Sequence, residues 1–193
     1  MINMRIRLKP KAGGGQPKKV TVIVTKDNDL GKLRPDRLKA IENGLNMAVT
    51  NGPLLSFPVI DFQVQLLEFH ATNSSSFAMV AAMTSQAITT AMKNADPVLL
   101  EPIMKLEIAV PDDLSGKVIT DLAKRRSEMG NMSGRGHLRV IHAFTPLSEL
   151  VHFATEIRIL TSGRANLSME LDSYRAMTEQ ETYSAAEKIN NFI

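Results

Sequence analysis

The pair Gly116–Lys117 is the first place in this sequence where residue types and spacing could do chemistry. A glycine followed by a lysine, where a loop turns into a helix, often holds a nucleotide phosphate. A phosphate loop also needs a glycine five residues before the pair and a serine or threonine after the lysine. Those positions hold Pro111 and Val118. Because Pro111 has no N–H for a phosphate and Val118 has no hydroxyl for magnesium, we interpret the pair as an ordinary helix start.

The four histidines do not suggest a metal site. His137 and His142 are five residues apart on a predicted strand, which puts them on opposite faces, and the chain has no cysteine. His152 stands between apolar residues on a predicted helix. His70 differs, because it ends a predicted strand and opens a polar loop, where a contact residue is accessible.

The loop after His70 contains Asn73 and three serines, residues 74–76. Nothing in its spacing suggests a hydrolase triad, and the serines are explained as loop and helix-capping residues. His70, Asn73 and Ser74 are therefore candidates for contact with a partner rather than for catalysis.

Basic residues are the remaining chemical signal. Lys124, Arg125 and Arg126 end a predicted helix, where cations also complement the helix dipole. Arg139 follows on the next predicted strand. We expect that strand to return beside the helix end, so that the four cations form a positive edge able to follow phosphates. Aromatic residues make up only 5% of the chain, so base stacking is not expected.

The composition is that of an ordinary globular protein. The 193 residues, 44% of them hydrophobic, favour two domains. A net charge of +3 permits a nucleic-acid or ribosomal partner without requiring one. The lack of cysteine excludes disulfides and thiol metal sites. We expect no membrane helix, since no apolar run reaches about 18 residues.

Strands and helices alternate in the first half of the chain. Met4 to Leu8 alternate apolar and basic residues, which predicts a strand over 2–10 that begins at once, as in a fragment of a longer protein. A turn over 12–19 separates it from a β-branched strand over 20–25. A helix beginning near Pro35 and ending at Gly52–Pro53, a strand over 58–69 and a helix over 77–95 follow.

The second half predicts one more compact unit. We expect strands over 103–110, 137–144 and 165–171, and helices over 116–126 and 146–160. A short strand around 130–134 would complete a β-α-β-β-α-β order, which is the ferredoxin-like arrangement. The fold class is therefore α+β, and residues 175–193 are expected to form a polar C-terminal tail that includes a short helix.

Several stretches resemble the translation elongation factor G family. The segment NGPLLSFPVIDFQVQL, residues 51–66, carries the family's Gly-Pro-Leu and Phe-Pro-Val-x-Asp pattern. The segment ADPVLLEPIMKLEI, residues 95–108, matches the family's junction between its fourth and fifth domains. The segments VITDLAKRRSEM and PLSELVHFATEIRILTSGRANLSMEL match the fifth domain, so the resemblance covers residues 1 to about 174.

The resemblance implies a fold, a domain boundary and a GTP-binding domain that lies outside this chain. Residues 1–97 would be the fourth domain, similar to domain 2 of ribosomal protein S5 and lacking its very N-terminal part. Residues 98–174 would be the ferredoxin-like fifth domain, and 175–193 the tail. The family is a GTPase whose G domain, with GTP and magnesium, lies outside this chain. We therefore expect no catalytic residue, cofactor or GTP hydrolysis here.

The resemblance also implies partners. The family contacts ribosomal RNA of both subunits, which would place His70, Asn73 and Ser74 at the decoding tip and Lys124, Arg125, Arg126 and Arg139 against RNA phosphates. A monomer without a membrane partner is expected.

Two features favour the recycling branch of the family over the translocase. The translocase tip reads His-Asp-Val-Asp-Ser-Ser, whereas residues 70–75 here read His-Ala-Thr-Asn-Ser-Ser, without either acid. The ending LSMELDSYRAM resembles the mitochondrial recycling type, ribosome-releasing factor 2. This implies a mitochondrial matrix protein that disassembles ribosomes with ribosome recycling factor. The alternatives are a translocase that moves tRNA and mRNA, and a cytoplasmic location for a bacterial homologue.

A free-standing enzyme with an active site between two domains is the competing hypothesis from another class. Such an enzyme needs titratable side chains that converge in a cleft. The sequence offers no spacing that would bring them together.

Overall fold

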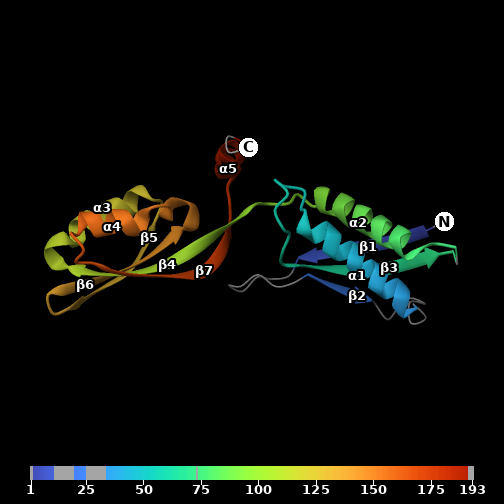
Figure 1. Ribbon diagram of the computed structural model, residues 1–193, viewed down its shortest axis with the longest axis horizontal. Coiled ribbons are helices and arrows are strands. Elements are labelled where there is room, and N and C mark those ends of the chain that lie inside the picture. Colours follow the sequence, from blue (N-terminus) through green and yellow to red (C-terminus); the bar gives the residue numbers. More distant parts are fainter. Residues whose placement is uncertain (1, 11–19, 25–33, 73, 191–193) are drawn as a thin grey trace. The chain divides into compact units, whose positions relative to one another are not determined.

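A computed structural model describes residues 2–10, 20–24, 34–72 and 74–190 (Figure 1). The predicted turn over 12–19 lies outside these ranges. The chain divides into two compact units, here called unit 1 and unit 2: Met1–Leu99 with Tyr183–Ile193, and Leu100–Thr182. Within each unit a sheet carries helices, so the α+β class with two sheets is confirmed.

Unit 1 is a three-stranded sheet with two helices on one face. Its elements in chain order are β1 (Ile2–Pro10), β2 (Thr21–Val24), α1 (Pro35–Thr50), β3 (Phe62–Ala71) and α2 (Phe77–Lys93). The strand order is β1-β3-β2. β1 runs antiparallel to the central strand β3, and β2 runs parallel to it.

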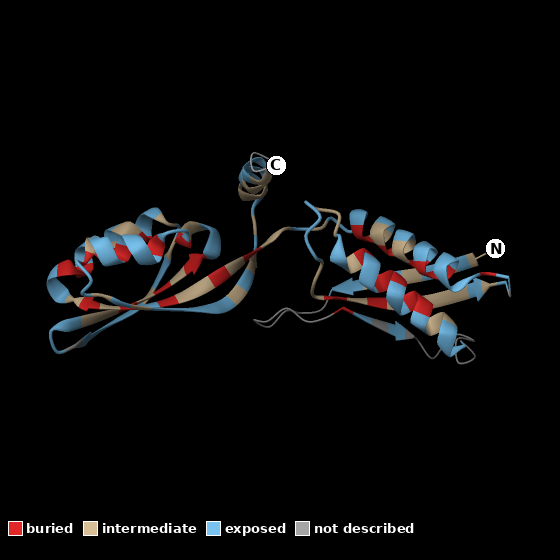
Figure 2. Cartoon of the chain, viewed as in Figure 1, coloured by how far each residue is buried: buried red, intermediate tan, exposed pale blue. Residues whose placement is uncertain are grey.

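Alternation along β1 decides which face of this sheet is covered. Its apolar residues pack against the core, whereas the residues between them are exposed. The same core takes alternate residues of β3 and one stripe from each helix, including Ile41, Leu45 and Ile88. Figure 2 shows the buried residues on the facing sides of the helices and the sheet.

Gly44 sets the spacing between α1 and α2. A Cβ atom added there would lie 2.3 Å from the Ala81 carbonyl oxygen and 2.7 Å from the Thr84 Cβ. The two helix backbones therefore approach so closely that only glycine fits at this position.

Unit 2 is a four-stranded antiparallel sheet with helices on one face. Its elements are β4 (Leu100–Pro111), α3 (Asp112–Lys124), β5 (Glu128–Arg135), β6 (Leu138–Pro146), the 3₁₀ helix η2 (Leu147–Leu150), α4 (Phe153–Leu160) and β7 (Asn166–Ala176). The strand order β5-β6-β4-β7 and the β-α-β-β-α-β sequence give the predicted ferredoxin-like arrangement. Its core joins one stripe of α3 to the central strands, through Val118, Leu122 and Ile108 among others.

The predicted helix over 146–160 is interrupted, which corrects the sequence interpretation. η2 ends at Leu150, His152 adopts the left-handed conformation with φ of 62°, and α4 begins only at Phe153. In a continuous α-helix the Glu149 carbonyl would accept the N–H of Phe153. Here the Arg125 guanidinium donates to that carbonyl at 2.6 Å, so a side chain takes the place of the helical bond.

The C-terminal segment holds more regular structure than a polar tail. β7 continues to Ala176, and α5 (Glu179–Asn190) follows. Thr178 and Glu181 start α5 with a reciprocal cap. The Glu181 carboxylate accepts the Thr178 N–H at 2.8 Å, and the Thr178 hydroxyl accepts the Glu181 N–H at 3.3 Å. The Ser/Thr-x-x-Glu pattern at 178–181 was the sequence signal for this helix start.

Candidate functional site

The loop between β3 and α2 is the first candidate contact surface. His70 is exposed near the end of β3 and lies opposite Asn3 of β1. Ser76 caps α2 by accepting the Met79 N–H at 3.2 Å, as the sequence predicted for the loop serines. Asn73 lies outside the described residues, and Ser74 is exposed.

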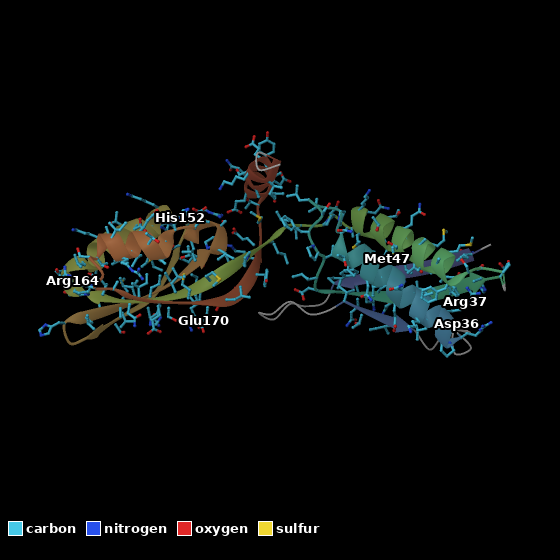
Figure 3. The ribbon with its side chains drawn as sticks, viewed as in Figure 1. Asp36, Arg37, Met47, His152, Arg164 and Glu170 are labelled. Carbon is cyan, nitrogen blue, oxygen red and sulfur yellow. The ribbon has the colours of Figure 1, made fainter. Side chains whose placement is uncertain are left out.

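Arg37 of α1 holds this loop in place. Its guanidinium donates to the Ser75 carbonyl at 2.6 Å and approaches the Thr72 carbonyl at 3.5 Å, so one side chain ties two loop positions to the helix (Figure 3). The Thr72 hydroxyl shares hydrogen bonds of 3.1 Å with the hydroxyls of Ser74 and Ser75. Thr72 and Ser75 are thus held by these bonds, and His70 and Ser74 are exposed.

Sequence reasoning missed Arg37, although a signal was present. Arg37 stands in the first turn of a helix that begins at Pro35. A cation in the first turn is unfavourable against the helix dipole unless another acceptor holds it. Its unfavourable position therefore indicates a partner outside the helix, which proves to be the loop.

At the second candidate surface, the end of α3, two of the three cations pair with carboxylates. Arg125 bonds Asp121 at 2.8 Å, pairs with Glu156 and lies 5.0 Å from the centre of the Phe153 ring. Arg126 bonds Glu101 at 3.1 Å and Glu149 at 3.2 Å, and also pairs with Glu181. Both arginines have acid partners within unit 2.

Glu101 is the centre of this ion-pair network. Its side chain is 5% exposed, and it also receives Arg175 at 3.3 Å, which pairs in turn with Glu128. A buried carboxylate needs such partners because desolvation penalises its charge. The network joins α3, β4, η2, β7 and the start of α5, so its first role is structural.

The pKa shifts agree with these contacts. Burial lowers the pKa of Arg125, but the hydrogen bond and charge of Asp121, followed by those of Glu156, outweigh burial and raise it above its ordinary value. The pKa of Arg126 is raised in the same way, with Glu101 overcoming burial. The hydrogen bonds from Thr178 lower the pKa of Glu181, and the charge of Arg126 adds to them.

Arg139 lies away from the other three cations, which corrects the expected positive edge. It pairs with Asp112, at the start of α3, at 2.7 Å. Lys124 stands at the other end of α3. The 13-residue helix separates the backbone of Lys124 from that of Asp112 by about 18 Å. The antiparallel register places Arg139 opposite Val110, at the end of β4, and so beside the beginning of α3. Lys124 is exposed and has no ion pair among the described residues.

Gly116 and Lys117 lie inside α3 rather than in a loop. The helix starts four residues earlier than predicted, at Asp112, because Pro111 and two acidic residues form a favourable N-terminus. The carboxylates of Asp112 and Asp113 in that first turn would repel a phosphate.

The described residues form neither a metal-ligand cluster nor a membrane-spanning helix. In the part of the chain that the structure describes, no three His, Asp or Glu side chains gather as metal ligands would. No described helix has the length and apolar character needed to span a membrane.

Comparison with known proteins decides the family. The family model "Elongation factor G, domain IV" matches residues 5–96, and "Elongation factor G C-terminus" matches residues 98–184. The chain belongs to the elongation factor G family. It comprises domain IV and the C-terminal region of that family, as the sequence segments suggested.

Several bacterial members of the family are similar to this chain. Elongation factor G of Fervidobacterium nodosum is 41% identical over 166 residues, and that of Thermotoga maritima is 42% identical over 166 residues. Each alignment covers 84% of this chain and 23% of the relative, so the chain spans about a quarter of their length. A crystal structure of a Thermus thermophilus protein has a TM-score of 0.82 at 28% identity, covering 96% of this chain and 27% of that one.

Proposed function

We propose that this chain is the ribosome-binding C-terminal portion of a translational GTPase. The observation that carries the proposal is the match of two consecutive elongation factor G regions along nearly the whole chain. GTP and magnesium would be bound in another part of the parent protein. These domains would then transmit its conformational change to ribosomal RNA by contact, without chemistry of their own.

The loop after β3 supports a role as the contact tip. Arg37 fixes its backbone, and His70 and Ser74 are exposed on it. A preorganised loop loses little conformational entropy on binding, which favours a contact made by shape. We place Asn73 at the same tip from its sequence position.

The basic residues of unit 2 have two roles in this proposal. Lys124 is exposed and available to a phosphate, and Arg139 is partly exposed beside a single surface acid. Arg125 and Arg126 are paired with carboxylates. An RNA strand that contacts them would also meet the negative charge of those carboxylates. RNA binding at this end should therefore depend mainly on Lys124.

The finer proposal is a mitochondrial factor that disassembles ribosomes after termination, together with ribosome recycling factor. Its support is the tip sequence without acids and the ending LSMELDSYRAM. The alternative is translocation, and it is favoured by the 42% identity to a Thermotoga maritima protein named elongation factor G.

Two reactions with the full-length parent protein separate these functions. A recycler should split post-termination ribosomes when GTP and ribosome recycling factor are present, and it should leave pre-translocation complexes in place. Light scattering reports subunit splitting, and toeprinting reports mRNA movement. Translocation without splitting would overturn the recycling proposal.

Ribosome binding by this chain tests the broader proposal. We expect the 193-residue chain to sediment with ribosomes. His70→Ala should weaken this binding about tenfold, as loss of a contact worth about 1.4 kcal/mol would. His137→Ala, at an exposed turn of unit 2, is the matched control and should bind normally. A chain that never sediments with ribosomes would contradict the proposal.

A further inference from the structure

The sheet of unit 1 has one face that no described element covers. α1 and α2 pack on the other face, through the apolar residues of β1 and β3. We call the uncovered side the open face. From β1 it receives Asn3, Arg5, Arg7 and Lys9, all exposed, because these residues alternate with the apolar ones. Three of the four are cations in a row along one strand.

The spacing of this row is regular. Side chains two residues apart on a strand lie roughly 7 Å apart and point to the same side of the sheet. Among the described residues, Arg7 and Lys9 have no ion pair. Arg5 pairs with Glu68 at 2.9 Å, and both of these side chains are exposed to solvent. Glu68 is the one acid that the described strands place on the open face.

The neighbouring strands place neutral residues beside this row, polar ones except for the exposed Ile23 opposite Gln65. In the register of the sheet, Gln65 lies opposite Arg7 and Gln63 lies opposite Lys9. Thr21 of β2 continues the line beyond Gln63. Primary amides and hydroxyls donate to phosphate oxygens and to ribose hydroxyls without adding charge.

The open face leads directly to the tip. His70 lies opposite Asn3 on this face, at the end of β3 where the polar loop begins. The cation row on β1 therefore begins two residues after Asn3, beside the tip, and continues along β1 to Lys9.

The open face of the unit 2 sheet has a different charge pattern. Lys105 on that face bonds Glu170 at 3.1 Å, and Glu170 is the main cause of its raised pKa, with Asp172 and Glu107 contributing. That face is acidic around a single lysine, so it would repel a phosphate backbone.

We propose that the open face of unit 1 binds the sugar–phosphate backbone of an RNA strand, with Arg7 and Lys9 on its phosphates and Gln63 and Gln65 on its backbone oxygens. The described face has no phenylalanine, tyrosine or tryptophan for base stacking, so recognition is independent of sequence. This inference rests on the proposed function, because it extends the ribosome contact from the tip along the sheet.

The test compares two double variants of equal charge. R7Q/K9Q removes the two cations of the open face that have no ion pair among the described residues. K39Q/K93Q removes two exposed lysines from α1 and α2, the helices on the opposite face. The probe is a short fluorescent single-stranded oligouridylate, whose binding to the 193-residue chain is measured by anisotropy across a salt series.

R7Q/K9Q should reduce the slope of log affinity against log salt by about 1.4, since each phosphate contact on a single strand contributes about 0.7. K39Q/K93Q should leave the slope unchanged. Equal effects of the two variants, or no effect of R7Q/K9Q, would overturn the proposal. A third variant separates the charge effect from an effect on the fold. Gln65→Glu adds an acid to the same face with all cations intact, and it should also weaken binding.

Ribosome sedimentation distinguishes this inference from the proposed function. If R7Q/K9Q binds ribosomes as well as the unchanged chain does, the open face is not the RNA contact and the proposed function stands. If the unchanged chain does not bind ribosomes, the proposed function itself fails. A third outcome would overturn the RNA proposal alone. In it, R7Q/K9Q loses ribosome binding, but the oligouridylate does not bind the unchanged chain and does not shift the NMR side-chain amide signals of Gln63 and Gln65. The open face would then contact a ribosomal protein.

Discussion

At the residue scale, the cations at the end of α3 show that one run of basic residues can serve both internal ion pairs and a free surface charge. Lys124, Arg125 and Arg126 form a run of cations that suggests an anion-binding surface. The structure gives Arg125 and Arg126 carboxylate partners from other elements and leaves Lys124 exposed. The distinction depends on residues far away in sequence, such as Glu101 and Glu181, which the local pattern does not reveal.

Removing Arg126 should destabilise unit 2. In Arg126→Ala, Glu101 would keep only Arg175 while remaining buried, and an under-satisfied buried charged group costs about 1–3 kcal/mol or more. Urea unfolding of the chain followed by hydrogen exchange in unit 2 measures the loss. Lys124→Ala is the control and should change the free energy of unfolding by less than about 0.5 kcal/mol. Equal stability of the two variants would show that the network is not structural.

Gly44 and Gly116 are both helical glycines, and they should respond oppositely to alanine. At Gly44 the new Cβ would overlap the Ala81 backbone, so Gly44→Ala should destabilise unit 1 by about 1–3 kcal/mol. At Gly116 nothing lies within 4 Å, so Gly116→Ala should stabilise α3 by up to about 1 kcal/mol through helix propensity. Hydrogen exchange of the two units measures both effects. A stabilising Gly44→Ala would contradict the close helix packing.

At the element scale, helix starts and ends follow local chemistry once tertiary partners are included. Alternation along β1, the cap at Ser76 and the sequence of strands and helices along unit 2 all follow from short-range pattern. The break between η2 and α4 does not, because the Glu149 carbonyl there accepts a bond from Arg125, which comes 24 residues earlier in the chain.

The start of α5 should be pH dependent. The folded-state pKa of Glu181 lies below its ordinary value of 4.5, so its ionised cap stabilises α5 at neutral pH. This stabilisation is complete above the unfolded-state value and is lost as the pH falls through the lower folded-state value. The protection factors of the α5 amides, which compare each exchange rate with that of an unfolded chain at the same pH, should therefore fall in acid. In Glu181→Gln, exchange at neutral pH should already be faster, and the acid dependence should flatten.

At the scale of the whole molecule, the two units carry different surfaces on similar frameworks. Each has helices on one face of its sheet, and no described element covers the other face. The open face of unit 1 carries a cation row, and that of unit 2 carries acids around Lys105. Of the two sheet faces, only that of unit 1 is therefore expected to attract RNA by its charge.

GTP should not bind specifically to this chain. Gly116 and Lys117 lie within α3, behind two aspartates, and lack the residues of a phosphate loop. Isothermal titration with GTP and magnesium should show no saturable heat, and hydrogen exchange in α3 should be unchanged. Inorganic triphosphate serves as the control for weak attraction of anions. Saturable binding of GTP, without binding of triphosphate, would refute the proposal that GTP binds in another part of the parent protein.

The sequence by itself determined the class of fold, nearly every element and the family. These follow from apolar periodicity, turn residues and contiguous motifs such as ADPVLLEPIMKLEI, all of which are local properties of the chain. Only the tertiary structure decided which cations are neutralised and which are exposed. It paired Arg125 and Arg126 with acids and separated Arg139 from Lys124. It also aligned Arg7 and Lys9 on a sheet face that no described element covers. The physical reason is that the effective charge of a side chain depends on its nearest opposite charges, and strand register and helix packing bring those from distant parts of the chain.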